Sequence, residues 1–134
     1  MPGTRHPEED TVPVVRADDH PSFELAGNTI TGFAAPSRGA TECILYRVEV
    51  PPGGGLPAHR HDHQDVFTVA AGGGTMHIDD EVHEIGPGDA VVVPTGAVHR
   101  LDAGSDGAAI VVTMLAGTRF IREDGTGSVP PWGE

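Results

Sequence analysis

The chain is interrupted by turn residues too often to form long helices. Short apolar stretches alternate with glycine and proline about every eight to twelve residues, and no segment keeps the i, i+3, i+4 apolar spacing of a helix. In residues 42–50, the apolar side chains of Ile44, Tyr46, Val48 and Val50 recur at every second position, as in a strand with one buried face. The 19 glycines and 12 prolines among 134 residues reach about twice the usual share. The pattern therefore predicts an all-β sandwich or small barrel.

Nine strands are expected, each bounded by turn residues. Their ranges are 23–25, 29–31, 42–50, 66–70, 76–78, 82–85, 90–93, 97–101 and 108–115. Tight hairpins are expected at Gly27-Asn28 and at Asp79-Asp80, and the run Gly72 to Gly74 is expected to end the strand before it.

A length of 134 residues fits one domain. We expect residues 1–20 to form a flexible N-terminal arm and residues 21–118 to form the barrel. Residues 119–134 are expected to form a tail that packs on the barrel or on a second subunit.

Composition excludes several classes of function. With 8 basic against 20 acidic residues the net charge is −12, so nucleic acid and anionic membranes are unfavourable partners. All basic residues are arginine, and without lysine a Schiff base or a phosphate-loop lysine is ruled out. The single cysteine, Cys43, excludes an intrachain disulfide and a cysteine-rich metal site. No stretch is long and apolar enough for a signal peptide or a membrane span, so a cytoplasmic location is expected.

The residues most suggestive of chemistry lie between positions 59 and 65. On an extended strand His59 and His61 point to the same face, and Asp65 has the same parity if the strand is not interrupted. Two imidazoles and a carboxylate on one face suit a divalent metal ion, with a further ligand from another strand. The best candidate for that ligand is His99, which follows a turn at Pro94 and is flanked by apolar residues. The alternative is that these histidines lie in solvated loops.

Two other catalytic patterns are absent. A binuclear metallohydrolase motif would need aspartate at position 63, where the chain has His63. The segment from Gly104 to Gly107 has the wrong spacing for a serine-hydrolase nucleophile motif.

Taken together, the residues resemble the two motifs of the cupin superfamily, over about residues 40–115. The first motif is matched by Gly53, His59, His61, Asp65 and Gly72, with aspartate where the family usually has glutamate. The second motif is matched by Gly88, Pro94, Gly96 and His99, with Ala103 where the family has asparagine.

This resemblance implies a jelly-roll β-barrel (a double-stranded β-helix), typically a homodimer, whose mouth binds a divalent metal ion. The implied ligands are His59, His61, Asp65 and His99, and iron, manganese, nickel and zinc are all compatible with them. Because the Asp65 side chain is one methylene shorter than glutamate, His63 is a possible substitute ligand.

The function expected from this site is that of a small metal-dependent enzyme, an oxygenase or an isomerase/cyclase. Its substrate is a small organic molecule, anionic or chelating, because a bound ion makes the pocket locally cationic. Candidate acid–base residues, if they face the cavity, are Tyr46, Arg47, Gln64 and His77. The alternatives are a metal-containing module that binds or senses a small molecule without turnover, and a barrel that binds no metal.

Overall fold

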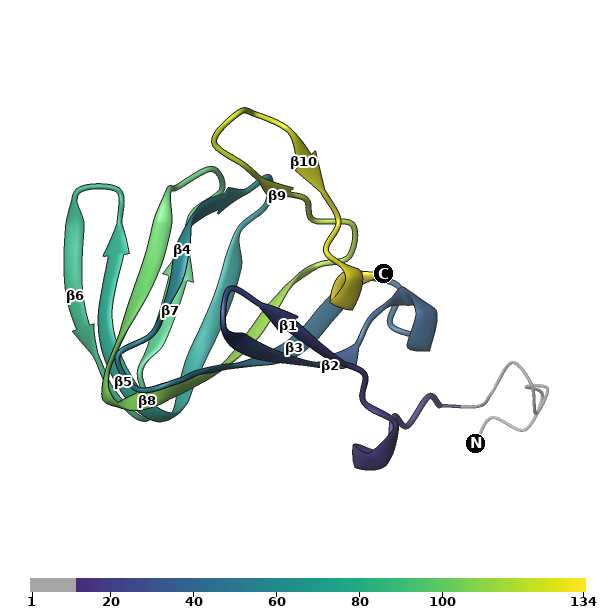
Figure 1. The fold of residues 1–134 in the computed structure, drawn as a ribbon. Coiled ribbons are helices and arrows are strands. Elements are labelled where there is room, and N and C mark those ends of the chain that lie inside the picture. Colours follow the sequence, from purple (N-terminus) through teal and green to yellow (C-terminus); the bar gives the residue numbers. More distant parts are fainter. Residues whose placement is uncertain (1–11) are drawn as a thin grey trace.

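The structure is a computed structural model that describes residues 12–134, and its regular secondary structure is almost entirely β-strand (Figure 1). The strands are β1 (Ser22–Leu25), β2 (Asn28–Ala34), β3 (Cys43–Val50), β4 (Gly55–His61), β5 (Asp65–Ile78), β6 (Glu81–Ile85), β7 (Ala90–Val93), β8 (His99–Leu115), β9 (Phe120–Ile121) and β10 (Gly127–Ser128). Short 3₁₀ turns cover Ala17–Asp19, Pro36–Arg38 and Pro131–Gly133. The prediction of an all-β jelly-roll barrel is confirmed.

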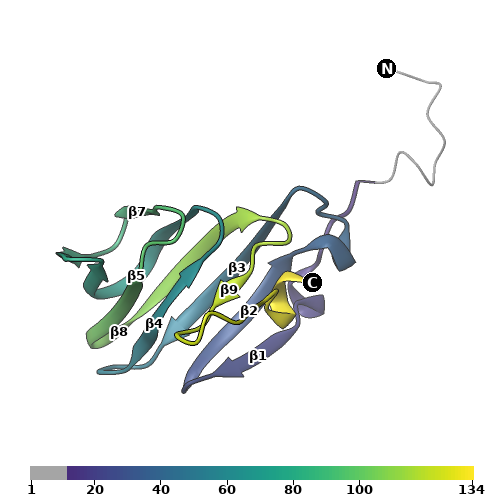
Figure 2. The same ribbon diagram turned by 90° about the horizontal axis from the view of Figure 1, so that it is seen from above.

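Strand β8 organises the sheet because it pairs antiparallel with three other strands. Its last eight residues pair with the whole of β3, its first residues pair with β4, and β5 runs beside nearly all of it. β2 and β1 extend the sheet beyond β3, while β6 and β7 pair with β5. The sheet curls so that β3, β4, β5 and β8 surround a common interior (Figures 1 and 2).

The core is formed by the inward faces of these strands. The alternation predicted for β3 is confirmed, since Ile44, Tyr46, Val48 and Val50 are buried while Cys43, Leu45 and Glu49 are exposed. Other strands and the C-terminal turn contribute the remaining large buried side chains, namely Ile30, Phe67, Val69, Met76, Val93, Leu101, Ile110, Val112, Met114 and Trp132.

The prediction that glycines 72 to 74 end a strand is wrong. They lie within β5, which continues to Ile78 and shifts its register against β8 between Gly72 and Gly74. A Cβ on Gly72 would lie 2.1 Å from the carbonyl oxygen of Gly107, so only glycine permits this approach of two backbones. The two separate strands expected at 97–101 and 108–115 likewise form one bent strand, β8.

Both predicted hairpins exist, one of them shifted by a residue. The β1–β2 turn is made by Ala26 and Gly27, which both have positive φ, and Asn28 is the first residue of β2, paired with Leu25. Asn28 is fully buried, and its side-chain nitrogen donates to the carbonyl oxygen of Gly55 at 3.0 Å. The hairpin at Asp79-Asp80 joins β5 to β6 as expected.

The segment after β8 returns over the barrel of its own chain. β9 pairs antiparallel with β4, and β10 pairs with β9.

At the other end of the chain, the first eleven residues of the expected arm lie outside the described residues. The division into an arm, a barrel and a tail stays a prediction, as does the homodimer. Within residues 12–134, no helix has the length and apolar character needed to cross a membrane.

Candidate metal centre

Two neighbouring strands place three histidines on one inward face. His59 and His61 alternate on β4, which ends at His61, and His99 is the first residue of β8. His59 and His99 are register partners across the β4–β8 ladder, and directly opposed side chains lie close together. Pro94 directly follows the last residue of β7, and the turn after it changes the direction of the chain before His99, as predicted.

The three imidazoles lie within contact distance of one another. Their ring centroids are 4.2 Å apart for His59 and His99, 4.8 Å for His59 and His61, and 4.9 Å for His61 and His99. One ligand nitrogen from each ring can be chosen so that all lie within 4.8 Å of one another. Three imidazole nitrogens at this separation can bind one divalent ion.

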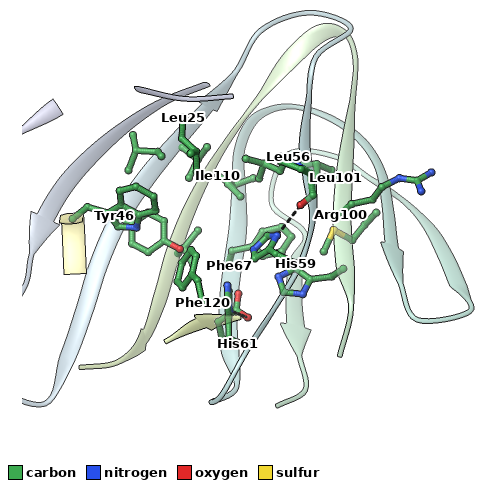
Figure 3. A pocket seen from close by; sticks show the side chains of 18 residues that line it. Leu25, Tyr46, Leu56, His59, His61, Phe67, Arg100, Leu101, Ile110 and Phe120 are labelled. Atoms are coloured by element: carbon green, nitrogen blue, oxygen red, sulfur yellow. Dashed lines mark hydrogen bonds and ion pairs between the residues drawn. The ribbon is translucent and has the colours of Figure 1, made fainter. Parts of the chain in front are cut away.

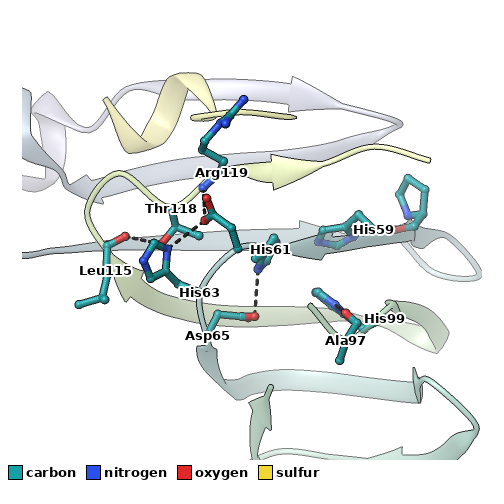
Figure 4. A network of polar contacts seen from close by, with 11 residues as sticks. His59, His61, His63, Asp65, Ala97, His99, Leu115, Thr118 and Arg119 are labelled. Carbon is teal, nitrogen blue, oxygen red and sulfur yellow. Dashed lines mark hydrogen bonds and ion pairs between the residues drawn. The ribbon is translucent and has the colours of Figure 1, made fainter. Parts of the chain in front are cut away.

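Each histidine uses Nδ1 for a local hydrogen bond, so Nε2 is left for a ligand. His59 Nδ1 lies 2.8 Å from the carbonyl oxygen of Pro57, and His99 Nδ1 lies 2.9 Å from that of Ala97. Since a carbonyl oxygen only accepts, both Nδ1 atoms carry the proton and Nε2 carries the lone pair. His61 Nδ1 lies 3.0 Å from Oδ1 of Asp65 (Figure 4), and a carboxylate imposes the same tautomer.

The structure offers a direct test of whether a metal ion fits. His61 is 3% exposed, and its Nε2 is buried without a hydrogen-bond partner among the described residues. A buried nitrogen lone pair without a partner is unfavourable. A metal ion bound between the three rings would satisfy it, so the residues present fit a metal centre.

Burial keeps the imidazoles of His59 and His99 neutral, which is the form that binds metal. Burial and the neighbouring charge of His99 lower the pKa of His59 from 6.5 to about 4. Burial also lowers the pKa of His99. Both rings are therefore deprotonated at neutral pH before any ion binds.

Asp65 reaches the site by a different route from the one its parity suggested. The extended segment is interrupted, because β4 ends at His61 and residues 62–64 form a turn before β5 begins at Asp65. Asp65 is 3% exposed and its carboxylate contacts His61. Among the described residues, only the three histidines have ligand atoms close enough to one another to share an ion. Direct binding of metal by Asp65 stays a prediction.

The other polar candidates lie mostly outside the cavity. His63 is a turn residue, 43% exposed at its side chain, and its Nδ1 lies 2.9 Å from Oδ1 of Asp62. Gln64 is exposed, Arg47 packs over the ring of Phe33, and His77 pairs with Asp102 on the outer surface. Tyr46 is the acid–base candidate that does line the cavity.

The histidines form one side of a cavity of about 110 Å³ inside the barrel (Figure 3). The rest of its lining is mainly apolar and includes Leu25, Ile30, Val48, Leu56, Phe67, Met76, Leu101, Ile110, Val112, Phe120 and Trp132. Burial and the nearby carboxylate of Asp65 raise the pKa of the Tyr46 phenol above its usual range. Tyr46 therefore stays protonated and can donate a hydrogen bond into the cavity.

Sequence reasoning did not find two features of this site. Phe120 stacks on His59 and lies tilted against His61, at ring-centroid distances of 5.6 and 4.1 Å. The sequence predicted that the tail formed by residues 119–134 packs on the barrel or on a second subunit, but gave no signal that Phe120 and Trp132 line the cavity. The hydrogen bond from His61 to Asp65 was not predicted either, although a spacing of four residues across a turn is compatible with it.

Comparison with known proteins places this architecture in a family. The sequence model described as Cupin domain matches residues 46–115. The chain is 32% identical over 101 residues to dimethylsulfoniopropionate lyase DddW of Ruegeria pomeroyi, a match that covers 75% of this chain and 64% of that protein. The chain thus spans less than two thirds of the length of this relative.

Solved structures agree on the fold. The polyketide cyclase RemF of Streptomyces resistomycificus superposes with a TM-score of 0.68 at 24% identity, covering 86% of this chain and 90% of that chain. A salicylate 1,2-dioxygenase from Pseudaminobacter salicylatoxidans superposes with a TM-score of 0.62 at 19% identity, covering 69% and 27%. At these identities the likeness concerns the barrel alone.

Proposed function

The chain belongs to the cupin family, and on that premise we propose that it is a metal-dependent enzyme acting on a small organic molecule, as an oxygenase or as an isomerase/cyclase. The observation that carries the proposal is the set of three imidazoles, two buried and one half-buried, whose Nδ1 atoms are engaged and whose free nitrogens converge beside an apolar cavity. Proteins similar to this chain include a lyase, a polyketide cyclase and a dioxygenase, so enzymatic chemistry on small molecules has precedent among them.

In this proposal His59, His61 and His99 hold the ion through Nε2. A divalent ion there would act as a Lewis acid that binds a substrate oxygen or sulfur and lowers the pKa of an enol, thiol or water. Three neutral imidazoles leave the charge of the ion undiminished, so the inner end of the cavity favours an anionic or chelating group.

Asp65 is assigned a positioning role in this proposal. Its carboxylate accepts the Nδ1 proton of His61 inside the barrel, where both residues are 3% exposed. Such a pair fixes the ring orientation and raises the basicity of the nitrogen that binds metal. Asp65 then needs no direct bond to the ion.

The other cavity residues bind the substrate and exclude water. The Tyr46 hydroxyl, which stays protonated, donates a hydrogen bond to a substrate oxygen. The ring of Phe120 lies against His61 and shields that side of the metal centre from bulk water.

The proposal is tested by metal content and turnover together. Protein purified without a histidine tag is analysed for transition metals, then loaded separately with Fe(II), Mn(II), Ni(II) and Zn(II). Each form is assayed for oxygen uptake and product formation with thiols, flavonols and β-diketones, and His99→Ala serves as the matched variant. We expect about one equivalent of metal and turnover that His99→Ala loses.

Two results would contradict the proposal. Less than about a tenth of an equivalent of any metal after loading would show that the histidines do not form a site. Tight metal binding with ligand binding but no turnover across the panel would instead support the non-catalytic binding module.

A further inference from the structure

The segment after β8 forms one wall of the cavity, although it lies beyond the residues that match the family. The match ends at residue 115, while Phe120 and Trp132 both line the cavity. The tail therefore contributes to the cavity, and its chemistry bears on which ligand the cavity accepts.

The tail is held in place at both ends. The backbone N–H of Arg119 donates to Oδ1 of Asp62 at 2.8 Å, and the N–H of Asp62 donates to the carbonyl oxygen of Arg119 at 3.1 Å. β9 then pairs with β4, which sets Phe120 opposite His61. At the C-terminus, the N–H of Ser37 donates to the carbonyl oxygen of Glu134 at 2.9 Å. The wall is therefore fixed in register with the metal centre.

Aromatic rings of this wall and of β3 run from the histidines into the barrel. Phe120 lies 4.1 Å from His61, Trp132 lies 5.8 Å from Phe120 at 75°, and Tyr46 lies 5.8 Å from Trp132. Tilted and edge-to-face arrangements at such distances are those that aromatic rings prefer. An aromatic ring of a ligand could join this row with the same geometry.

The two sides of the cavity differ in polarity. Figure 3 shows His61 on one side and Leu25 and Ile110 across the cavity from it. A ligand that fills the cavity must therefore have a metal-binding group at one end and an apolar body at the other. The whole cavity, at about 110 Å³, is somewhat smaller than the ~150 Å³ apolar cavity that holds benzene, so an apolar body larger than one six-membered ring does not fit.

We propose that the cavity binds a molecule with a single aromatic ring that carries an anionic or chelating oxygen group, with the ring against Phe120 and Trp132 and the oxygen group at the three histidines. This inference deepens the proposed function and rests on it for the metal ion. It assigns ring recognition to the tail and head-group recognition to the barrel strands.

The test uses two hydroxamates that differ only in their body. Benzohydroxamate and acetohydroxamate share one chelating group, and the first carries a phenyl ring where the second carries a methyl group. Each is titrated into the Zn(II)-loaded, ¹⁵N-labelled protein. Trp132 is the only tryptophan, so its single indole N–H signal reports whether a ligand reaches the wall.

We expect benzohydroxamate to bind at least about tenfold more tightly than acetohydroxamate, because the ring is buried, and to shift the indole signal while acetohydroxamate does not. Phe120→Leu keeps an apolar side chain and should reduce the preference by about 3- to 10-fold, since it removes the ring contact. Phe33→Leu, which changes a ring packed against His20 outside the cavity, is the matched control and should leave the preference unchanged.

Equal affinity for the two hydroxamates, or a preference that survives Phe120→Leu intact, would overturn the inference. So would retention of zinc with no binding of either hydroxamate. If the protein retains no zinc, the proposed function fails separately, and the wall is tested in the metal-free protein with benzamide and acetamide. A shift of the indole signal by benzamide alone would support the aromatic wall, and no shift would overturn it.

Discussion

The histidines inside the cavity form their hydrogen bonds through Nδ1, whereas two of the histidines on the outer surface form theirs through Nε2. The surface residue His63 is the exception, since it uses Nδ1. His59, His61 and His99 each engage Nδ1 with an acceptor and leave Nε2 free. On the surface, His77 and His83 engage Nε2 with the carboxylates of Asp102 and Glu81, at 3.1 and 2.9 Å. His63 contacts its neighbour Asp62 through Nδ1 in an exposed turn.

This difference explains why a chain with eight histidines presents one candidate metal centre in its described part. Metal binding needs several unengaged nitrogens that converge, and it needs them neutral. Burial supplies the second condition by lowering the pKa of His59 and His99. His63, His77 and His83 on the surface fail the first condition, because acidic partners occupy ring nitrogens and none of the three belongs to a converging group.

The largest effect is expected when one histidine is removed from each region and the metal affinities of the two variants are compared. We expect His99→Ala to weaken metal binding by roughly 100-fold or more, since one of three protein ligands is lost. His63→Ala is the matched control and should leave binding unchanged, because its exposed ring lies outside the converging group. Metal equivalents after dialysis against a weak chelator measure both; the opposite pattern would identify a different ligand set.

A second comparison concerns the acidic partners of two histidines. Asp65→Asn should weaken metal affinity by about 10- to 100-fold, because it removes the charge that orients and polarises His61. Glu81→Gln changes the equivalent partner of His83 on the surface and should have no effect. A competition titration measures the affinities. If Asp65→Asn costs as much as His99→Ala, Asp65 is itself a ligand and the positioning role is wrong.

The third test uses pH on the metal-free protein. Because the pKa of His59 falls from 6.5 to about 4 on folding, the unfolded chain binds more protons between these values. The free energy of unfolding should therefore decrease as pH falls from 6.5 toward 4, and we expect a loss of about 2 kcal/mol from this residue. Urea unfolding at a series of pH values measures it. His59→Gln should flatten the dependence, and an unchanged slope in that variant would assign the effect elsewhere.

The smallest effect is expected on the surface. His83→Gln removes an exposed pair with Glu81, in which both side chains are more than half exposed. Such pairs contribute little, so the free energy of unfolding should change by less than about 0.5 kcal/mol. Urea unfolding at neutral pH checks this, and a loss of several times that size would show that the surface histidines have a structural role.

The strands could be predicted from the sequence more readily than their ends. The alternation in residues 42–50 gave the buried face of β3 correctly, because period-two patterning reflects a single buried side. The glycines at 72–74 were mistaken for a strand end, because a glycine that permits close backbone contact has the same local appearance as one that permits a turn. Whether such a glycine ends a strand or continues it depends on its pairing with β6 and β8, and this pairing cannot be read from the residues around the glycine.

Local spacing and motif resemblance by themselves determined which histidines would meet, because alternate residues of a strand share a face and the turn at Pro94 directs His99 toward it. The tertiary structure alone decided that Asp65 contacts His61 and that Phe120 and Trp132 line the cavity. Those contacts depend on how a turn and a returning tail cross the barrel. The path of such segments is set by packing and by hydrogen bonds between distant residues, which no local pattern encodes.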